Sequence, residues 1–387
     1  MSGAACETTA TFDTAKGDFI IHTPHAAAAK NWISQGCHAE SAVILANLID
    51  SGGTNRGPHL FWARIGTMQR NKSVAPLKGV TVGSVPTKTA LASLDNAVIS
   101  FDAFRVPASS LLSRYAEVDA TSGAYVARLP KGCSRMEDVL ISRLLTGRIV
   151  LSEYTLSVAV DLMRRSWKYV QGRELWRGKK EHGKKMAEMS NVQRAFADYG
   201  RCLAILTAFA ASVREAVGCA IAEDRFDAAA AEGCCVAKFT CTSFAVDAVS
   251  AIRKTLGASA LFEESRLGAS SFVCYATCAA EGDNTIMELK VVGDVIRGRR
   301  PWLPCGMRPL TAAAGRAALA AYARLVATAL WKGQAAIKDG QLLRDIAWSR
   351  AHLMIIDAWL AQPGADASWL ESYERVMRPG HPTPVAF

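Results

Sequence analysis

The chain has 387 residues, of which 50% are hydrophobic and 21% charged, and this composition is typical of a globular protein with a sizeable core. No uninterrupted apolar run reaches about 18 residues and no basic, apolar leader opens the chain, so the sequence indicates neither a membrane span nor a secretory signal. Its 11 cysteines form no CxxC pair, which favours reduced thiols in an intracellular protein over disulfides or zinc, and we expect no metal site.

The first 115 residues have the pattern of a β-domain. Two runs of strand formers flank Lys16-Gly17, which predicts a hairpin. Residues 41–49, SAVILANLI, form a continuous apolar run typical of a strand buried on both faces. Further strands recur at short spacing without helical patterns between them. We therefore expect an antiparallel barrel or sandwich.

The rest of the chain has helical periodicity. Residues 115–135 resemble a connecting loop, and from residue 136 apolar residues recur at three- and four-residue steps. Helices are predicted over 186–222, 225–256 and 285–296, with a segment broken by glycine and serine at 257–280. Residues 297–310, with three prolines, resemble a linker before two more amphipathic helices. The expected fold is α+β, with a β-domain (1–115), a helical bundle (116–300) and a C-terminal helical domain (301–387).

Much of the net charge of +10 lies in residues 164–185, where Trp167, Tyr169 and Trp176 are interleaved with lysine and arginine. Such a run can bind nucleic acid by phosphate contact and stacking, or the phosphates of a nucleotide-bearing ligand. It can equally be a solvated helix face and loop. The pattern does not identify the partner.

The stretch AAEGDNTIMELK, residues 279–290, combines helix-start signals with an unexplained glutamate. Asp283, Asn284 or Thr285 can cap the following helix, and Glu288 stands at capping-box spacing from Thr285. In that interpretation Glu281 needs no function. A carboxylate beside a helix N-terminus can also act as a general base, and the residues alone leave both interpretations open.

EGDNT before an apolar helix resembles the catalytic motif of the peroxisomal acyl-CoA oxidase family. Further segments resemble that family in the same order, although each match is imperfect. They are residues 7–24, 30–34 (KNWIS), 80–85 (VTVGSV), 93–126, 168–176 (KYVQGRELW) and 348–360. The family's order starts with a helical domain, whereas this chain begins at the β-domain. The resemblance thus implies a divergent member without that domain and with a shortened C-terminal one.

The resemblance implies an FAD-dependent enzyme that converts fatty acyl-CoA to trans-2-enoyl-CoA and reduces oxygen to hydrogen peroxide. Glu281 matches the family's catalytic base, which removes a proton next to the thioester carbonyl. Gly282, Asp283 and Thr285 match positions near the flavin nucleotide, and Arg173 matches an arginine that meets flavin phosphates across a dimer. Arg148 matches a residue that holds the acyl-CoA. A homodimer and a peroxisomal location are also implied, although the C-terminus HPTPVAF is not an SKL-type address; the other location considered is the cytoplasm.

Two other functions are open at this level. The chain departs from the family's flavin-contacting glycines at Ser34 and at Leu256-Gly257-Ala258-Ser259-Ala260. Those departures favour a catalytically inactive acyl-CoA oxidase-like subunit or a truncated fragment. A basic nucleic-acid-binding protein using residues 164–185 ranks last, because that function makes no use of EGDNT or of the β-domain.

Overall fold

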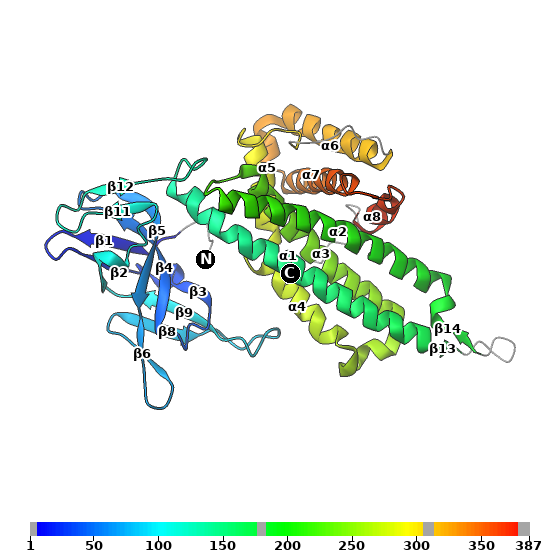
Figure 1. Cartoon of the computed structure of the whole chain (residues 1–387), viewed down its shortest axis with the longest axis horizontal. Coiled ribbons are helices and arrows are strands. Elements are labelled where there is room, and N and C mark those ends of the chain that lie inside the picture. The colour runs from blue at the N-terminus through cyan, green and yellow to red at the C-terminus, as the bar shows by residue number, and fades with distance from the viewer. Residues whose placement is uncertain (1–5, 176–182, 305–312, 378–387) are drawn as a thin grey trace. The chain divides into compact units, whose positions relative to one another are not determined.

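The computed structural model describes residues 6–175, 183–304 and 313–377. It divides into two compact units, one of residues 1–143 with 223–226 and the other of residues 144–222 with 227–387 (Figure 1). The first unit holds a curled β-structure and the second a bundle of helices. The predicted α+β class is confirmed.

Two sheets form the body of the first unit. The larger has the strand order β10-β2-β1-β4-β5 and the smaller the order β3-β9-β8. Their strands are β1 (Thr9–Asp13), β2 (Asp18–His22), β3 (Lys30–Ser34), β4 (Ser41–Ile49), β5 (Asn55–Arg64), β8 (Val80–Ser84), β9 (Asn96–Phe101) and β10 (Phe104–Pro107). Shorter hairpins pair β6 (Gly66–Met68) with β7 (Val74–Pro76), and β11 (Ala116–Val118) with β12 (Tyr125–Ala127). The second of these lies where the sequence predicted a connecting loop.

The hairpin predicted around Lys16-Gly17 is present. β1 and β2 pair antiparallel, and Gly17 has a φ of 64° in the turn, a conformation that glycine adopts without steric cost. One pairing departs from the all-antiparallel expectation, because β1 and β4 run parallel. The chain passes through β3, in the other sheet, before β4 joins the larger one, and such a crossover connection is what a parallel pair requires.

The strand β4 is buried on one face only, so the expectation of burial on both faces is wrong. Ile44, Ala46 and Leu48 are at most 3% exposed, whereas Val43 is 57% exposed. Because side chains alternate along a strand, only every second residue of β4 points into the core of the β-unit. The residues between them are also apolar, so the composition of the run did not show that they face outward. Phe19 packs edge-on against Phe61 in the same core.

The second unit is built on long helices. The first begins at Met136, where the sequence predicted it, and the helices predicted over 186–222, 225–256 and 285–296 are all present, with starts that differ by one to four residues. The helices are α1 (Met136–Gly172), α2 (Ser190–Ala222), α3 (Ala228–Leu256), α4 (Leu267–Ala279), α5 (Asn284–Ile296), α6 (Ala313–Lys332), α7 (Gly340–Leu360) and α8 (Trp369–Met377). At the far end of α1, the two-residue strands β13 (Glu174–Leu175) and β14 (Lys184–Lys185) pair.

The segment 257–280 is more ordered than its glycines and serines suggested. After the short 3-10 turns η4 (Gly257–Leu261) and η5 (Glu263–Ser265), it forms α4, which packs along α3. Serines do not break this helix, because Ser271 donates its hydroxyl to the carbonyl of Leu267 four residues earlier. The sequence also missed α8, which packs on α2.

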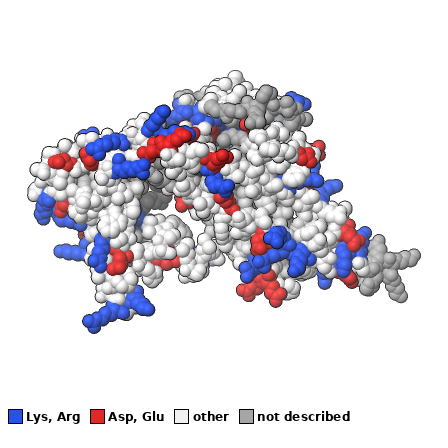
Figure 2. Space-filling model, in the orientation of Figure 1, with Lys and Arg blue, Asp and Glu red and all other residues white. Residues whose placement is uncertain are grey.

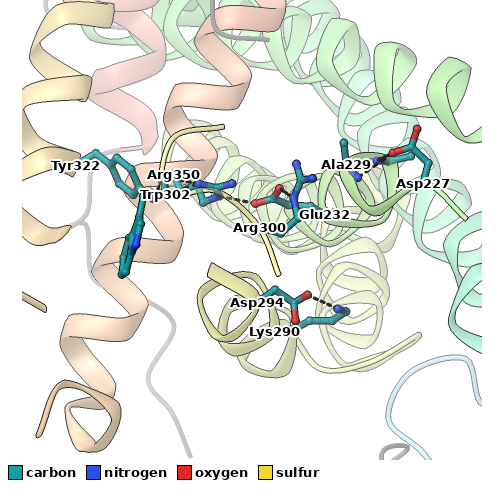
Figure 3. Close-up of polar contacts among 10 residues, drawn as sticks. Asp227, Ala229, Glu232, Lys290, Asp294, Arg300, Trp302, Tyr322 and Arg350 are labelled. Carbon is teal, nitrogen blue, oxygen red and sulfur yellow. Dashed lines mark hydrogen bonds and ion pairs between the residues drawn. The ribbon is translucent and has the colours of Figure 1, made fainter. Parts of the chain in front are cut away.

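Residues 297–304 are anchored rather than forming a free linker, so that part of the linker expectation is wrong; residues 305–310 lie outside the described residues. Arg300 pairs with the buried Glu232 of α3 at 2.7 Å, and Arg350 of α7 pairs with the same carboxylate (Figure 3). The carbonyl of Trp302 accepts from Arg350 Nη1 at 2.6 Å and from the Tyr322 hydroxyl of α6 at 2.5 Å. These contacts hold α6 and α7 against α3.

Among the residues that the structure describes, two helices are long and apolar enough to cross a membrane by length and composition alone. They are Ser190–Ala222 and the stretch Ala228–Leu261, whose most apolar windows are 44% and 78% buried inside the protein. The core helices of a bundle pass the same test, so this finding is weak evidence for a membrane span.

Candidate functional site

The turn between α4 and α5 carries Glu281. We call residues Glu281–Asn284 the EGDN turn. Asp283 is the N-cap of α5, and its carboxylate accepts from the backbone N–H of Thr285 at 2.8 Å. Glu281 has a φ of 53° and Gly282 a φ of 97°. A left-handed glutamate costs about 1 kcal/mol or more, so the surrounding structure must hold this turn.

The Glu281 side chain lies against the backbone of α1. A Cβ at Gly147 would stand 2.8 Å from Cδ of Glu281, and 3.0 and 3.1 Å from its two carboxylate oxygens. Only a glycine therefore lets the carboxylate come this close to the helix. Glu281 as a residue is nevertheless exposed.

Arg148, the next residue of α1, meets the same turn. Its Nε donates to the backbone carbonyl of Glu281 at 3.3 Å, and its Nη1 donates to the Cys235 sulfur of α3 at 3.5 Å. The side chain is buried, with 5% of Arg148 exposed. The structure thus brings together Glu281 and Arg148, which the sequence singled out separately. The link is to the backbone of the turn; the expected contact with acyl-CoA stays a prediction.

A buried lysine, which sequence reasoning missed, supports the turn from the other side. Lys238 of α3 is 0% exposed, and its Nζ donates to the carbonyls of Cys278 and Gly282 at 2.5 and 2.6 Å and to Asn284 Oδ1 at 2.7 Å. Asn284 in turn donates to the Thr242 hydroxyl at 3.0 Å. The signal was in the sequence: Lys238 is a single charge inside the apolar run CCVAKFTCTSFAV, where an unpartnered lysine would be costly.

Gly282, Asp283 and Thr285 all lie at this helix start. Gly282 supplies a carbonyl to Lys238, Asp283 supplies the cap, and Thr285 is exposed. A Cβ at Gly282 would lie 2.7 Å from the terminal methyl of Met287, so glycine fits both the backbone conformation and the space. Their expected role in binding the flavin nucleotide stays a prediction.

The capping box proposed for Thr285 and Glu288 is not formed, so that expectation is wrong. Glu288 is 2% exposed and points to α7, where Trp348 Nε1 donates to it at 2.9 Å and Arg344 Nε lies 3.1 Å away. Burial raises the pKa of the Glu288 carboxyl, although Arg344 and Trp348 oppose the shift. Helix packing thus uses this carboxylate for a contact 60 residues away.

Arg173 lies far from the EGDN turn along the same helix as Arg148. The two arginines are 25 residues apart, and Arg173 directly follows the last residue of α1. At a rise of 1.5 Å per residue, this separation is about 37 Å along the helix axis. Arg173 is exposed, and its backbone N–H donates to Tyr169 at 2.9 Å. One chain therefore cannot place Arg148 and Arg173 in the same small site. The expected contact of Arg173 with flavin phosphates across a dimer stays a prediction.

The residues that replace the family's glycines at Leu256–Ala260 introduce no backbone strain. Among these five residues only Gly257 has a positive φ, of 65°, while the alanines lie in η4 with ordinary angles. Elsewhere in the described part of the chain, no group of three or more His, Cys, Asp or Glu side chains is placed to hold a metal ion.

The described part of the basic run is partly neutralised. Lys185 pairs with Glu174 at 2.6 Å, and Arg165 pairs with Asp161 at 2.7 Å; residues 176–182 lie outside the described residues. Figure 2 shows basic and acidic side chains interspersed on the face in view rather than gathered in one patch. This distribution does not favour a nucleic-acid interface.

The known proteins that resemble this chain in sequence or structure are acyl-CoA oxidases. No family model matches the chain. Peroxisomal acyl-coenzyme A oxidase 2 of Oryctolagus cuniculus is 39% identical over 147 residues, covering 37% of this chain and 21% of that protein. The acyl-coenzyme A oxidase of Debaryomyces hansenii is 26% identical over 317 residues, covering 76% and 43%. The chain thus spans less than half the length of these curated relatives.

Solved structures agree on the fold. The crystal structure of acyl-CoA oxidase-1 of Caenorhabditis elegans, complexed with FAD and ATP, superposes with a TM-score of 0.73 at 20% identity, covering 96% of this chain and 60% of that one. The β-unit followed by a helical bundle is therefore the fold of acyl-CoA oxidases. The chain is thus similar to acyl-CoA oxidases over part of their sequence and in its fold.

Proposed function

We propose that this chain is an acyl-CoA oxidase-like flavoprotein that converts fatty acyl-CoA to trans-2-enoyl-CoA and reduces oxygen to hydrogen peroxide. The observation that carries the proposal is the position of Glu281. Its carboxylate rests on Gly147 and belongs to a turn that Lys238 and Arg148 hold by the backbone. A base must be held in one place to remove a proton from a bound substrate.

Glu281 removes the proton from the carbon next to the thioester carbonyl and takes it onto its carboxylate. Bound FAD would supply the acceptor for the hydride that leaves the neighbouring carbon. Oxygen would then take up the two electrons and two protons, one from the hydride and one released by Glu281, to give hydrogen peroxide and restore the carboxylate. The N-terminus of α5, a helix of 13 residues, carries partial positive charge beside the Gly282 backbone, and the Asp283 carboxylate already caps it.

Gly282, Asp283 and Thr285 would lie along the nucleotide end of the flavin, and Arg173 would bind flavin phosphates with its planar fork. Because Arg173 stands about 37 Å along α1 from Arg148, it would serve the site of a second copy in a homodimer. Arg148 would act on the substrate indirectly, through the turn, since it donates to the Glu281 carbonyl and to the Cys235 sulfur. The resemblance to peroxisomal enzymes supports a peroxisomal location.

The test uses purified protein supplied with FAD. We expect flavin absorbance to remain with the protein after gel filtration, and acyl-CoA to trigger peroxide release. Glu281→Gln should abolish peroxide release while flavin stays bound, because the amide cannot take the proton. Glu263→Gln, at an exposed glutamate in η5, is the matched control and should behave as wild type.

The second function is an inactive subunit that keeps the fold. The exposure of Glu281 in this chain favours it, because a catalytic base usually works in a site closed to water. Protein that binds FAD yet releases no peroxide would support this function and contradict the first. Protein that stays colourless with excess FAD would contradict both flavin binding and oxidase activity.

A further inference from the structure

We propose that Lys238 is the residue that positions Glu281, and that it does so by fastening the EGDN turn from inside the bundle. We call its three contacts, with the Cys278 carbonyl, the Gly282 carbonyl and Asn284 Oδ1, the Lys238 clamp. Because these contacts are made with the turn and its flanks, Lys238 is a positioning residue and not a catalytic one. Its effect on turnover rests on the proposed function, whereas the clamp itself does not.

The three acceptors match the ammonium group. A charged lysine has three N–H donors and no acceptor, and here each donor has one oxygen at 2.5 to 2.7 Å. The oxygens come from the last turn of α4, the middle of the EGDN turn and the first residue of α5. One side chain therefore fixes both where α4 ends and where α5 begins.

The charge is tolerated for an electrostatic reason. The Cys278 carbonyl belongs to the C-terminal end of α4, which carries partial negative charge. The pKa of Lys238 is lowered to about 8, chiefly by burial and to a lesser extent by Arg148 of α1, while Cys278 of α4, Asp283 of the turn and Cys235 of α3 oppose the shift. At pH 7 the charged lysine, with all three donors, is therefore the main form.

Lys238 holds the middle of the turn, whereas other residues help to hold its two ends. Asn284 donates to the Thr242 and Ser243 hydroxyls, and the Glu281 carbonyl accepts from Arg148. The Gly282 carbonyl, between these ends, accepts from Lys238. Gly282 is also the residue with a φ of 97°, so the clamp acts where the backbone reverses. Without it, the left-handed Glu281 loses a nearby restraint.

The first test is hydrogen exchange of the full chain at pH 7, comparing Lys238→Met with Lys254→Met. Methionine keeps the length of the side chain and removes its donors, and Lys254 is an exposed lysine of the same helix. We expect the amides of Thr285 and Met287, which donate to Asp283, to exchange at least tenfold faster in Lys238→Met. Lys254→Met should match wild type. Unchanged protection of these amides in folded Lys238→Met overturns the clamp.

A second measurement needs no variant to fold. If opening of the turn releases Lys238 into water, the open state regains an ordinary lysine pKa and binds more protons than the closed state above pH 8. Linkage then makes opening less favourable as pH rises. The protection factors of Thr285 and Met287 in wild type should rise between pH 8 and about 10, by up to about tenfold per pH unit. Flat protection factors would show that the turn opens without Lys238 and would overturn the clamp.

The catalytic consequence has its own readout. Lys238→Met supplied with FAD should lose kcat for peroxide release by about a hundredfold with little change in KM, because a displaced base affects the chemical step. Faster exchange with unchanged kcat overturns the positioning role. If wild type releases no peroxide, the proposed function fails, and the exchange measurements still decide the clamp.

Discussion

Gly147→Ala probes the position of Glu281 without touching either the carboxylate or its turn. The new Cβ would stand 2.8 Å from Cδ of Glu281, whereas carbon atoms in contact prefer about 3.5 Å or more. The side chain must therefore move by about 0.7 Å at least. Because Glu281 is exposed, it can swing away from α1 at little cost.

We expect the change to separate stability from activity. Alanine is favoured over glycine inside a helix by about 0.5 to 1 kcal/mol, so the free energy of unfolding should stay level or rise by up to about 1 kcal/mol. A base displaced by about 1 Å can cost about a hundredfold in rate, so kcat for peroxide release should fall by about that factor. Flavin content should not change, since the substitution lies on the α1 side of the carboxylate.

The assay compares Gly147→Ala with Gly218→Ala, a helical glycine of α2 whose added Cβ meets nothing within 4 Å. Urea unfolding gives the stability of each variant, and steady-state peroxide release gives kcat and KM. Full activity in a folded Gly147→Ala protein would refute the reasoning, because the carboxylate would then not work from its place on α1. A loss of more than about 2 kcal/mol in stability would show instead that the helix, not the side chain, had to move.

Two further predictions concern the dimer and a buried carboxylate. If Arg173 serves the partner's site, inactive Glu281→Gln and Arg173→Ala proteins mixed under subunit exchange should regain about a quarter of wild-type activity, since half of the dimers are mixed and each mixed dimer has one intact site. Mixtures that stay inactive despite proven exchange would contradict this. For Glu288, burial raises the folded-state pKa, so its contribution to stability is fully present below the unfolded pKa of about 4.5 and is lost as pH rises through the folded value. The free energy of unfolding of wild type relative to Glu288→Gln should therefore fall as pH rises above about 4.5, and a constant difference across that range would contradict the assignment.

The sequence predicted what depends on neighbours along the chain. The start of α1 at Met136, the β1–β2 hairpin at Gly17 and a cap at the start of α5 all came from local signals. Periodicity and capping act within a few residues, so they can be identified without the fold. These local signals left Glu281 as part of a helix start, and it was the resemblance of EGDNT and of the other segments to the acyl-CoA oxidase family that singled it out as a candidate base.

The contacts between residues that are far apart in the sequence depend on tertiary packing and could not be predicted from local signals. Glu288 fits a local capping box as well as a contact with α7, and only the packing of α5 on α7 chose the second. The outward face of β4 depends on which side the rest of the β-unit covers. Lys238 meets acceptors 40 to 46 residues away, and Gly147 meets Glu281 through the packing of α1 on the turn. The sequence, through its resemblance to a family, singled out Glu281 as the candidate base. Only the packing of the helices determined where its carboxylate lies, because no local interaction fixes a distance between segments so far apart in the chain.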